Sequence, residues 1–239
     1  MSYYFGFTLE AHSILVSDQK RSEYHTDGTV RNFLQTKIWK IRDDLYVTGA
    51  GNLSFAEDCV LKAVPQVIKD KVLDLNDLAA GLGEWAEYFE RNYRILEENS
   101  RPINQLRDKH LDSALQDDTC VMLAGIDQRG TPFLLDFHSL NNFKGDLSVG
   151  LFKARLLGLC PEGVALKDAE QLQNRMTNAV KRRLETLANM KYELERIKRA
   201  TKIMPEIIAM AAKEDNFVSR EYDLVVVGPT GPRLFNGRS

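Results

Sequence analysis

Two apolar runs at the start of the chain predict a β-hairpin. Residues 3–9 (YYFGFTL) are rich in aromatic side chains, and residues 13–17 (SILVS) form a second apolar run. Aromatic and β-branched residues favour strands. Because only residues 10–12 separate the two runs, a short turn is expected there, with the two strands paired.

The polar segment that follows is expected to be a loop. It covers residues 18–32 and contains the turn signal Asp27-Gly28. Beyond it, residues 37–41 (KIWKI) alternate as in a half-exposed strand, and residues 45–51 (LYVTGAG) return after a turn. The first fifty residues are therefore expected to form four short antiparallel strands.

Helical spacing of apolar positions then predicts two helices. The first covers residues 54–68, with Pro65 expected to kink or shorten it, and the second runs from residues 74–76 to about residue 97. Residues 101–118 are polar and include one proline, so they are expected to form a loop.

The second half of the chain repeats this order of strands and helices. Residues 119–127 (TCVMLAGID) and 131–139 (TPFLLDFHS) predict another hairpin. A helical stretch is expected over residues 167–200, a shorter helix over 205–213 and a last strand over 222–228. This order predicts an α+β fold in which antiparallel sheets are stacked and covered by helix pairs on both faces, in a single domain of residues 1–239.

Composition and charge narrow the possible partners. The formal net charge is −2 with 28% charged residues, so the basic excess typical of proteins that bind nucleic acid is absent. Cys59, Cys120 and Cys160 are odd in number and lack a CxxC pair, so we expect no disulfide framework, no metal site and no cofactor. Without a leader pattern or about 18 consecutive apolar residues, the chain is expected to be cytoplasmic, without membrane contact.

Four short motifs carry a resemblance to a known family. They are Ser2 directly before a strand, SILVSD ending in Asp18, KIWKI opening with Lys37, and VTGAG ending in Gly51. The acid follows Ser2 by 16 positions (18 minus 2), and the glycine follows Lys37 by 14 (51 minus 37). With these intervals the chain is similar to the proteasome β-type subunits, which are N-terminal nucleophile (Ntn) hydrolases.

The resemblance also covers the end of the chain, where AAKEDNFVSREYDLVVV is similar to the last helix, acidic loop and strand of that family. The extended helical segment around residues 167–213 and the start without a propeptide are most like the bacterial ancestral β-subunit type, Anbu. The resemblance implies a four-layer αββα sandwich of two antiparallel sheets flanked by helix pairs.

The resemblance also implies a catalytic set. After removal of Met1, Ser2 would offer a hydroxyl nucleophile and an α-amine, whose ordinary pKa of about 7.7–8.0 suits a base near neutrality. Lys37 would lie beside that hydroxyl, Asp18 would keep Lys37 charged and oriented, and the backbone N–H of Gly51 would stabilise the oxyanion.

Other positions match supporting roles in that family. Asp215 corresponds to an acid near the nucleophile's amine, but the family's serine three residues later falls on Val218, with Ser219 one place further on. Gln35, Gly49 and Leu53 match positions that shape the first specificity pocket, which a glycine and a leucine would leave open and apolar.

The function implied is a self-assembling peptidase that forms an acyl-enzyme ester on Ser2. Its partners would be peptides or unfolded proteins, other copies of the chain in a ring or spiral, and in some systems an unfoldase. A catalytically silent structural subunit and a narrow Ntn amidase or peptide ligase are the alternatives.

Ordinary explanations exist for each residue taken alone. Many proteins begin Met-Ser, Asp18 could end a turn, and Lys37 could face solvent as Lys40 does; it is the joint spacing that favours the catalytic interpretation. His138 and Ser139 adjoin each other, but the sequence shows no evident acid to orient the histidine, so this pair is interpreted as structural.

Overall fold

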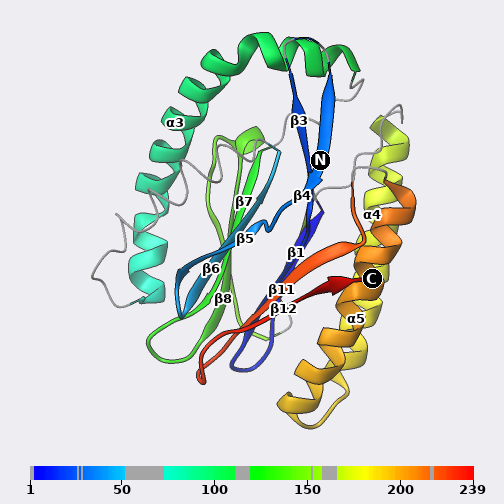
Figure 1. Cartoon of the computed structure of the whole chain (residues 1–239). Helices are drawn as coiled ribbons and strands as arrows, with labels where there is room; N and C mark the ends of the chain where they lie inside the picture. The colour runs from blue at the N-terminus through cyan, green and yellow to red at the C-terminus, as the bar shows by residue number, and fades with distance from the viewer. Residues whose placement is uncertain are drawn as a thin grey trace.

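Antiparallel sheets and long helices make up the part of the chain that the structure describes (Figure 1). The structure is a computed structural model, and it describes residues 3–25, 27, 29–51, 73–110, 119–151, 153–157, 166–215 and 218–239. The α+β class expected from the sequence is confirmed. The helix expected over residues 54–68 lies outside the described residues.

The first five-stranded sheet contains both ends of the described chain. Its order is β10-β1-β2-β11-β12, and each neighbouring pair is antiparallel. The expected first hairpin is present as β1 and β2 in register, and the expected last strand is β11. The strands are β1 (Tyr4–Thr8), β2 (Ser13–Asp18), β10 (Ala154–Leu157), β11 (Glu221–Val227) and β12 (Arg233–Arg238).

The second five-stranded sheet has the order β5-β6-β7-β8-β9 and is a simple antiparallel meander. Both hairpins expected within it are confirmed. The strands are β5 (Ile38–Arg42), β6 (Leu45–Ala50), β7 (Cys120–Ile126), β8 (Pro132–His138) and β9 (Asp146–Val149), and a short 3-10 turn, η3 (Ser139–Asn141), follows β8.

The expectation of a loop over residues 18–32 is wrong. This segment forms a separate two-stranded ribbon, β3 (Lys20–Tyr24) paired with β4 (Val30–Leu34). β4 is exposed along most of its length, so it carries few of the apolar side chains by which a strand is recognised in a sequence. The first fifty residues therefore hold six strands, where four were expected.

The helix boundaries also differ from the expected ones. The helix expected to end near residue 97 continues through the polar stretch as α3 (Leu75–His110), so the loop expected from residue 101 is wrong up to residue 110; residues 111–118 lie outside the described chain. A polar stretch of good helix formers can extend a helix into solvent, and the proline at position 102 did not end it.

The long helical segment is two helices and not one long and one short. α4 (Leu166–Ala188) ends before a turn, and α5 (Glu193–Glu214) begins after Tyr192, whose extended backbone (φ −108°, ψ 132°) separates them. Pro205 lies inside α5. The buried face of α5 outweighs the one backbone hydrogen bond that proline removes.

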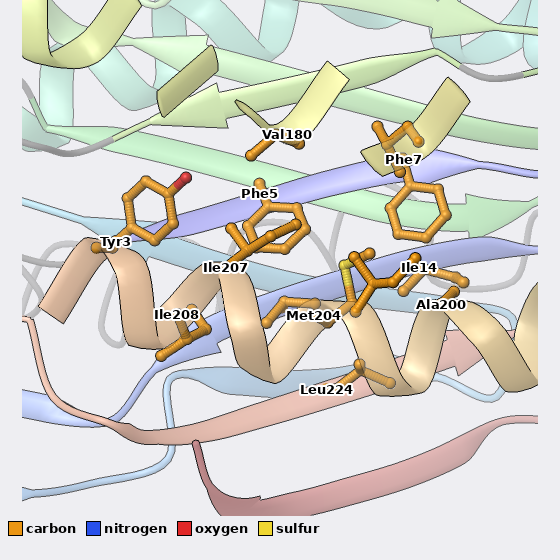
Figure 2. Packing of buried hydrophobic residues seen from close by; sticks show 14 of the residues in the cluster. Tyr3, Phe5, Phe7, Ile14, Val180, Ala200, Met204, Ile207, Ile208 and Leu224 are labelled. Atoms are coloured by element: carbon orange, nitrogen blue, oxygen red, sulfur yellow. The ribbon is translucent and has the colours of Figure 1, made fainter. Parts of the chain in front are cut away.

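Three apolar clusters hold the layers together. The first lies between α4, α5 and one face of the first sheet, and Figure 2 shows the rings of Tyr3, Phe5 and Phe7 beside Met204 and Ile207 of α5. The second lies between α3 and the second sheet. The third joins the two sheets to each other.

These clusters follow the alternation of the strands. Along β1, Phe5 and Phe7 belong to the helix-facing cluster and Tyr4 to the cluster between the sheets. Val180 and Leu184 of α4 belong to an apolar stripe that packs on the first sheet. In Figure 1, α3 lies on one side of the two sheets and the α4–α5 pair on the other.

Gly6 marks the closest approach of the two sheets. A Cβ atom at this position would lie 2.8 Å from Sδ of Met122 and 2.9 Å from Cδ2 of Leu134, both on the second sheet. Only glycine therefore permits this spacing without movement of neighbours.

Replacing Gly6 by valine is expected to lower the free energy of unfolding by about 1–3 kcal/mol, because the added atoms overpack the cluster between the sheets. Gly83→Ala on α3 is the matched control, since a Cβ there meets no atom within 4 Å. It should stabilise the protein by about 0.5–1 kcal/mol through helix propensity. Urea unfolding measures both, and equal effects would contradict this packing.

Within the described ranges, no helix is both long enough and apolar enough to cross a membrane.

Candidate functional site

Strand ends bring three of the predicted catalytic residues to one edge of the sheets. Asp18 ends β2, Lys37 directly precedes β5, and Gly51 directly follows β6. Because Ile38 pairs with Thr48, the start of β5 and the end of β6 lie side by side. Ser2, the predicted nucleophile, lies outside the described residues.

Asp18 and Lys37 form a buried ion pair. The Nζ atom of Lys37 lies 3.1 Å from Oδ1 of Asp18, and the side chains are 1% and 0% exposed. Removing two charges from water costs several kcal/mol for each ion, so such a pair persists only where further hydrogen bonds compensate.

Three backbone N–H groups supply those hydrogen bonds to Asp18. Tyr3 donates to Oδ1 at 2.8 Å, Lys20 donates to Oδ2 at 3.0 Å, and Ser219 donates to Oδ2 at 3.3 Å. With the Lys37 ammonium, the carboxylate accepts four hydrogen bonds from four parts of the chain. These four donors fix the orientation of the carboxylate and satisfy its buried oxygens.

The start of the described chain is fixed to the same carboxylate. Besides the bond from its nitrogen, Tyr3 accepts a hydrogen bond through its carbonyl from the Asp18 N–H at 3.0 Å. Tyr3 is fully buried, and burial raises the pKa of its hydroxyl above the ordinary value. The backbone nitrogen of Tyr3 is therefore held 2.8 Å from Oδ1 of Asp18, the oxygen that also contacts Lys37. This nitrogen forms the peptide bond to residue 2.

Burial and neighbouring charges shift the pKa of Lys37. Burial lowers the pKa of its ammonium below the ordinary value, because the charged form is poorly solvated. The negative charges of Asp18 and Asp223 oppose this shift without cancelling it, and Arg21 adds to it. A lysine in this state gives up its proton more readily than a surface lysine does.

The structure brings Ser219 to the site and directs Val218 to the core. Ser219 donates its N–H to Asp18, accepts a bond from the Gln19 N–H at 3.2 Å, and donates its hydroxyl to the carbonyl of Glu221 at 2.8 Å. Val218 is 4% exposed in the cluster under α5.

Asp215 is buried just after α5, and its carbonyl accepts a hydrogen bond from the N–H of Val218 at 3.1 Å. This turn carries the chain from the end of α5 towards Ser219. Asp215 thus lies in the segment that the resemblance indicates.

Gly51 directly follows β6 in a backbone conformation that favours glycine. Its φ angle of 81° lies in the left-handed region.

The predicted pocket residues lie around the same edge. The Gln35 N–H donates to the carbonyl of Gln19, and the Gln35 side chain accepts a bond from Arg21 at 2.7 Å. Gly49 is buried in β6 opposite Val121. Leu53 lies outside the described residues.

Asp223 is a charged residue near Lys37 that was not predicted from the sequence. It lies buried on β11, opposite Ser17 of β2, and accepts a hydrogen bond from Nε2 of Gln19 at 2.7 Å. Burial raises its pKa above the ordinary value of 3.8, against the opposing effects of Gln19 and of the Lys37 charge. No sequence signal marked it, because the pairing of β11 with β2 creates this contact.

Asp223→Asn is expected to become more stable relative to the wild type as the pH rises from about 4 to 7. A folded pKa raised above 3.8 means that ionisation of Asp223 weakens the folded state, and the amide cannot ionise. Thermal melts across this pH range measure the difference. Asp43→Asn, at a residue 77% exposed, is the control, and parallel curves for both variants would contradict the result.

The interpretation of His138 as lacking an orienting acid is wrong. Asp136, two residues earlier on β8, places Oδ2 3.1 Å from Nε2 of His138, and Sγ of Cys120 lies 3.3 Å from Nδ1. Ser139, the neighbour considered from the sequence, instead accepts a hydrogen bond from the Thr119 N–H at 2.8 Å. Residues two apart on a strand point to the same face of the sheet. The spacing of Asp136 and His138 in the sequence therefore indicated that their side chains could meet.

Cys120 is buried, at 3% exposed, whereas Cys59 and Cys160 lie outside the described residues. In the described part of the chain, no group of three or more histidine, cysteine or acidic side chains could hold a metal ion.

Comparison with known proteins gives no further identification. No protein-family model matches the chain, and no curated protein matches it.

Proposed function

We propose that the chain is a self-assembling N-terminal nucleophile peptidase of the proteasome β type, most like the Anbu proteins. The observation that carries this proposal is the buried Asp18–Lys37 pair, with the Tyr3 backbone bonded to the same carboxylate. An ammonium kept out of water costs stability and is retained where its chemistry is used. Asp18, the partner of Lys37, also accepts a hydrogen bond from the N–H of Tyr3, the residue that follows Ser2 in the sequence, and Ser2 is the target that we propose for this chemistry.

The arrangement of layers supports the proposal. The α4–α5 pair, the two sheets and α3 are joined by three successive apolar clusters, in the order of a four-layer αββα sandwich. Ser219, which contacts Asp18, supports the match at the end of the chain.

In the proposed reaction, removal of Met1 exposes the α-amine of Ser2. This amine takes the proton of the Ser2 hydroxyl while Oγ attacks the carbonyl carbon of a peptide bond. The Lys37 ammonium stabilises the developing alkoxide, and Asp18 holds Lys37 in place. The proton then passes from the α-amine to the leaving amine, which leaves an ester on Ser2.

The backbone N–H of Gly51 stabilises the tetrahedral oxyanion in both halves of the reaction. Water, activated by the α-amine, hydrolyses the ester and regenerates Ser2. Gln35 and Gly49 belong to the surface that receives the substrate side chain.

Self-association is part of the proposal. A two-stranded ribbon such as β3–β4 is marginal when it stands alone in water. Its exposed apolar residues Val30 and Leu34, 45% and 55% exposed, are consistent with a second copy of the chain as the covering surface. Light scattering measures the assembly.

Hydrolysis of a broad peptide panel, with and without amine acceptors, tests the function. Lys37→Met should lower the rate by about 10²–10⁴-fold, the usual contribution of a group that assists proton transfer. Lys40→Met is the matched control, because Lys40 lies on the same strand but is 55% exposed, and its rate should be unchanged. No turnover by the wild type would favour a silent structural subunit, and transfer to the added amine would favour a ligase.

A further inference from the structure

A second group of side chains, outside the proposed hydrolase site, has the geometry of a reactive thiol. Cys120 begins β7, and Asp136 and His138 lie near the end of β8. The register places Cys120 directly opposite His138 and Met122 opposite Asp136. All four side chains therefore lie on one face of the sheet, which is the face towards the first sheet.

The contacts within this group form an ordered chain. Sγ of Cys120 lies 3.3 Å from Nδ1 of His138, and Nε2 of the same ring lies 3.1 Å from Oδ2 of Asp136. A nucleophile within reach of a base, with the base held by a third group, is the arrangement that activates a weak nucleophile. Because the thiolate is the reactive form of cysteine, a histidine that takes the thiol proton raises reactivity near neutrality.

The surroundings orient the imidazole ring. Asp136 is 6% exposed, and its carboxylate lies within hydrogen-bond distance of Nε2 of His138. Asp146 of β9 lies opposite Asp136 and adds a second negative charge on this side. The His138 ring is 21% exposed, so it can exchange protons with solvent while it contacts the buried thiol.

We propose that Cys120, His138 and Asp136 form a peroxide-reactive thiol site. Nδ1 of His138 takes the thiol proton, and the Cys120 thiolate attacks one oxygen of a hydroperoxide. The O–O bond breaks, the leaving oxygen takes the proton from the imidazolium, and Cys120 becomes a sulfenic acid. Sulfur loses two electrons to the peroxide, and for hydrogen peroxide the second product is water.

A small peroxide suits the site because Cys120 is only 3% exposed. The proposal does not depend on the proposed hydrolase, whose groups are Ser2, Lys37 and Asp18.

The experiment measures the rate at which hydrogen peroxide oxidises Cys120 in the native full chain between pH 6 and 9, by peptide mass, with Cys59 and Cys160 as internal comparisons. In the wild type the rate should level off at least about one pH unit below the ordinary thiol pKa of 8.5. In His138→Gln it should keep rising through pH 8.5. His25→Gln, at an exposed histidine of the β3–β4 turn, should behave as the wild type.

Asp136→Asn keeps both the thiol and the imidazole and should shift the pH dependence upward by an intermediate amount. If His138→Gln does not fold, the pH dependence of Asp136→Asn tests the proposal in its place. Two results would overturn the proposal. One is the same pH dependence in wild type and variants. The other is oxidation of Cys120 only after unfolding in denaturant, which would leave a structural hydrogen bond and no reactive site.

Discussion

Ser2→Ala is expected to lower peptide hydrolysis by about 10⁴-fold or more, because it removes the atom that would form the acyl-enzyme ester. Alanine is small enough for Met1 still to be removed, so the variant keeps the α-amine and isolates the contribution of the hydroxyl. The measurement is the steady-state rate on the best peptide of the panel.

Ser2→Thr is the matched control for this prediction. It keeps both a hydroxyl and an α-amine and should retain activity, within the limits set by one added methyl group. Unchanged turnover in Ser2→Ala would show that another residue supplies the nucleophile.

Asp18→Ala is expected to lower the free energy of unfolding by about 3–5 kcal/mol, the usual cost of breaking a buried ion pair by removing one partner. The Lys37 ammonium would stay buried beside an apolar side chain. The N–H groups of Tyr3, Lys20 and Ser219 would lose their acceptor at the same time.

Urea unfolding at neutral pH measures this change. Asp43→Ala is the control, because its ion pair with Lys40 joins side chains that are 77% and 55% exposed and should contribute little. Asp18→Asn should be intermediate, since one amide oxygen can still accept hydrogen bonds while the amide NH₂ faces other donors. Equal midpoints for Asp18→Ala and Asp43→Ala would mean that the buried pair does not stabilise the fold.

The parts of the fold that bury one face were predictable from the sequence. The hairpins of β1 with β2 and of β7 with β8 are apolar runs separated by turns, and the stripe on α4 and α5 follows the helical period. In each case the side chains that enter the hydrophobic core recur at the period of the strand or helix, and this recurrence is visible in the sequence.

Segments with a mostly polar sequence were missed for the same reason. The β3–β4 ribbon and the last turns of α3 are rich in polar residues, so no apolar period distinguishes them from loops. The edge strand β12 is exposed along its whole length and gave no signal either. The turn at residues 189–192 depends on local backbone conformation, which helical periodicity does not report.

The candidate site shows a similar division. Asp18, Lys37 and Gly51 were found through the spacing of motifs at strand ends, and the structure brings Asp18 and Lys37 into contact. Asp223 and the contacts of His138 with Asp136 and Cys120 were missed, because they arise from strand pairing and from side chains that share a face of the sheet. The local periodicity of a sequence does not show which distant strands pair or in which register.

The most direct test of the central claim is the mass of the intact chain after incubation with a peptide epoxyketone, a reagent that bonds to both the hydroxyl and the α-amine of an N-terminal nucleophile. We expect a chain that lacks Met1 and carries one inhibitor on Ser2, with labelling slowed strongly in Lys37→Met and unchanged in Lys40→Met. A catalytically active chain that retains Met1, or a chain trimmed to Ser2 that hydrolyses peptides without ever accepting the inhibitor, would contradict it.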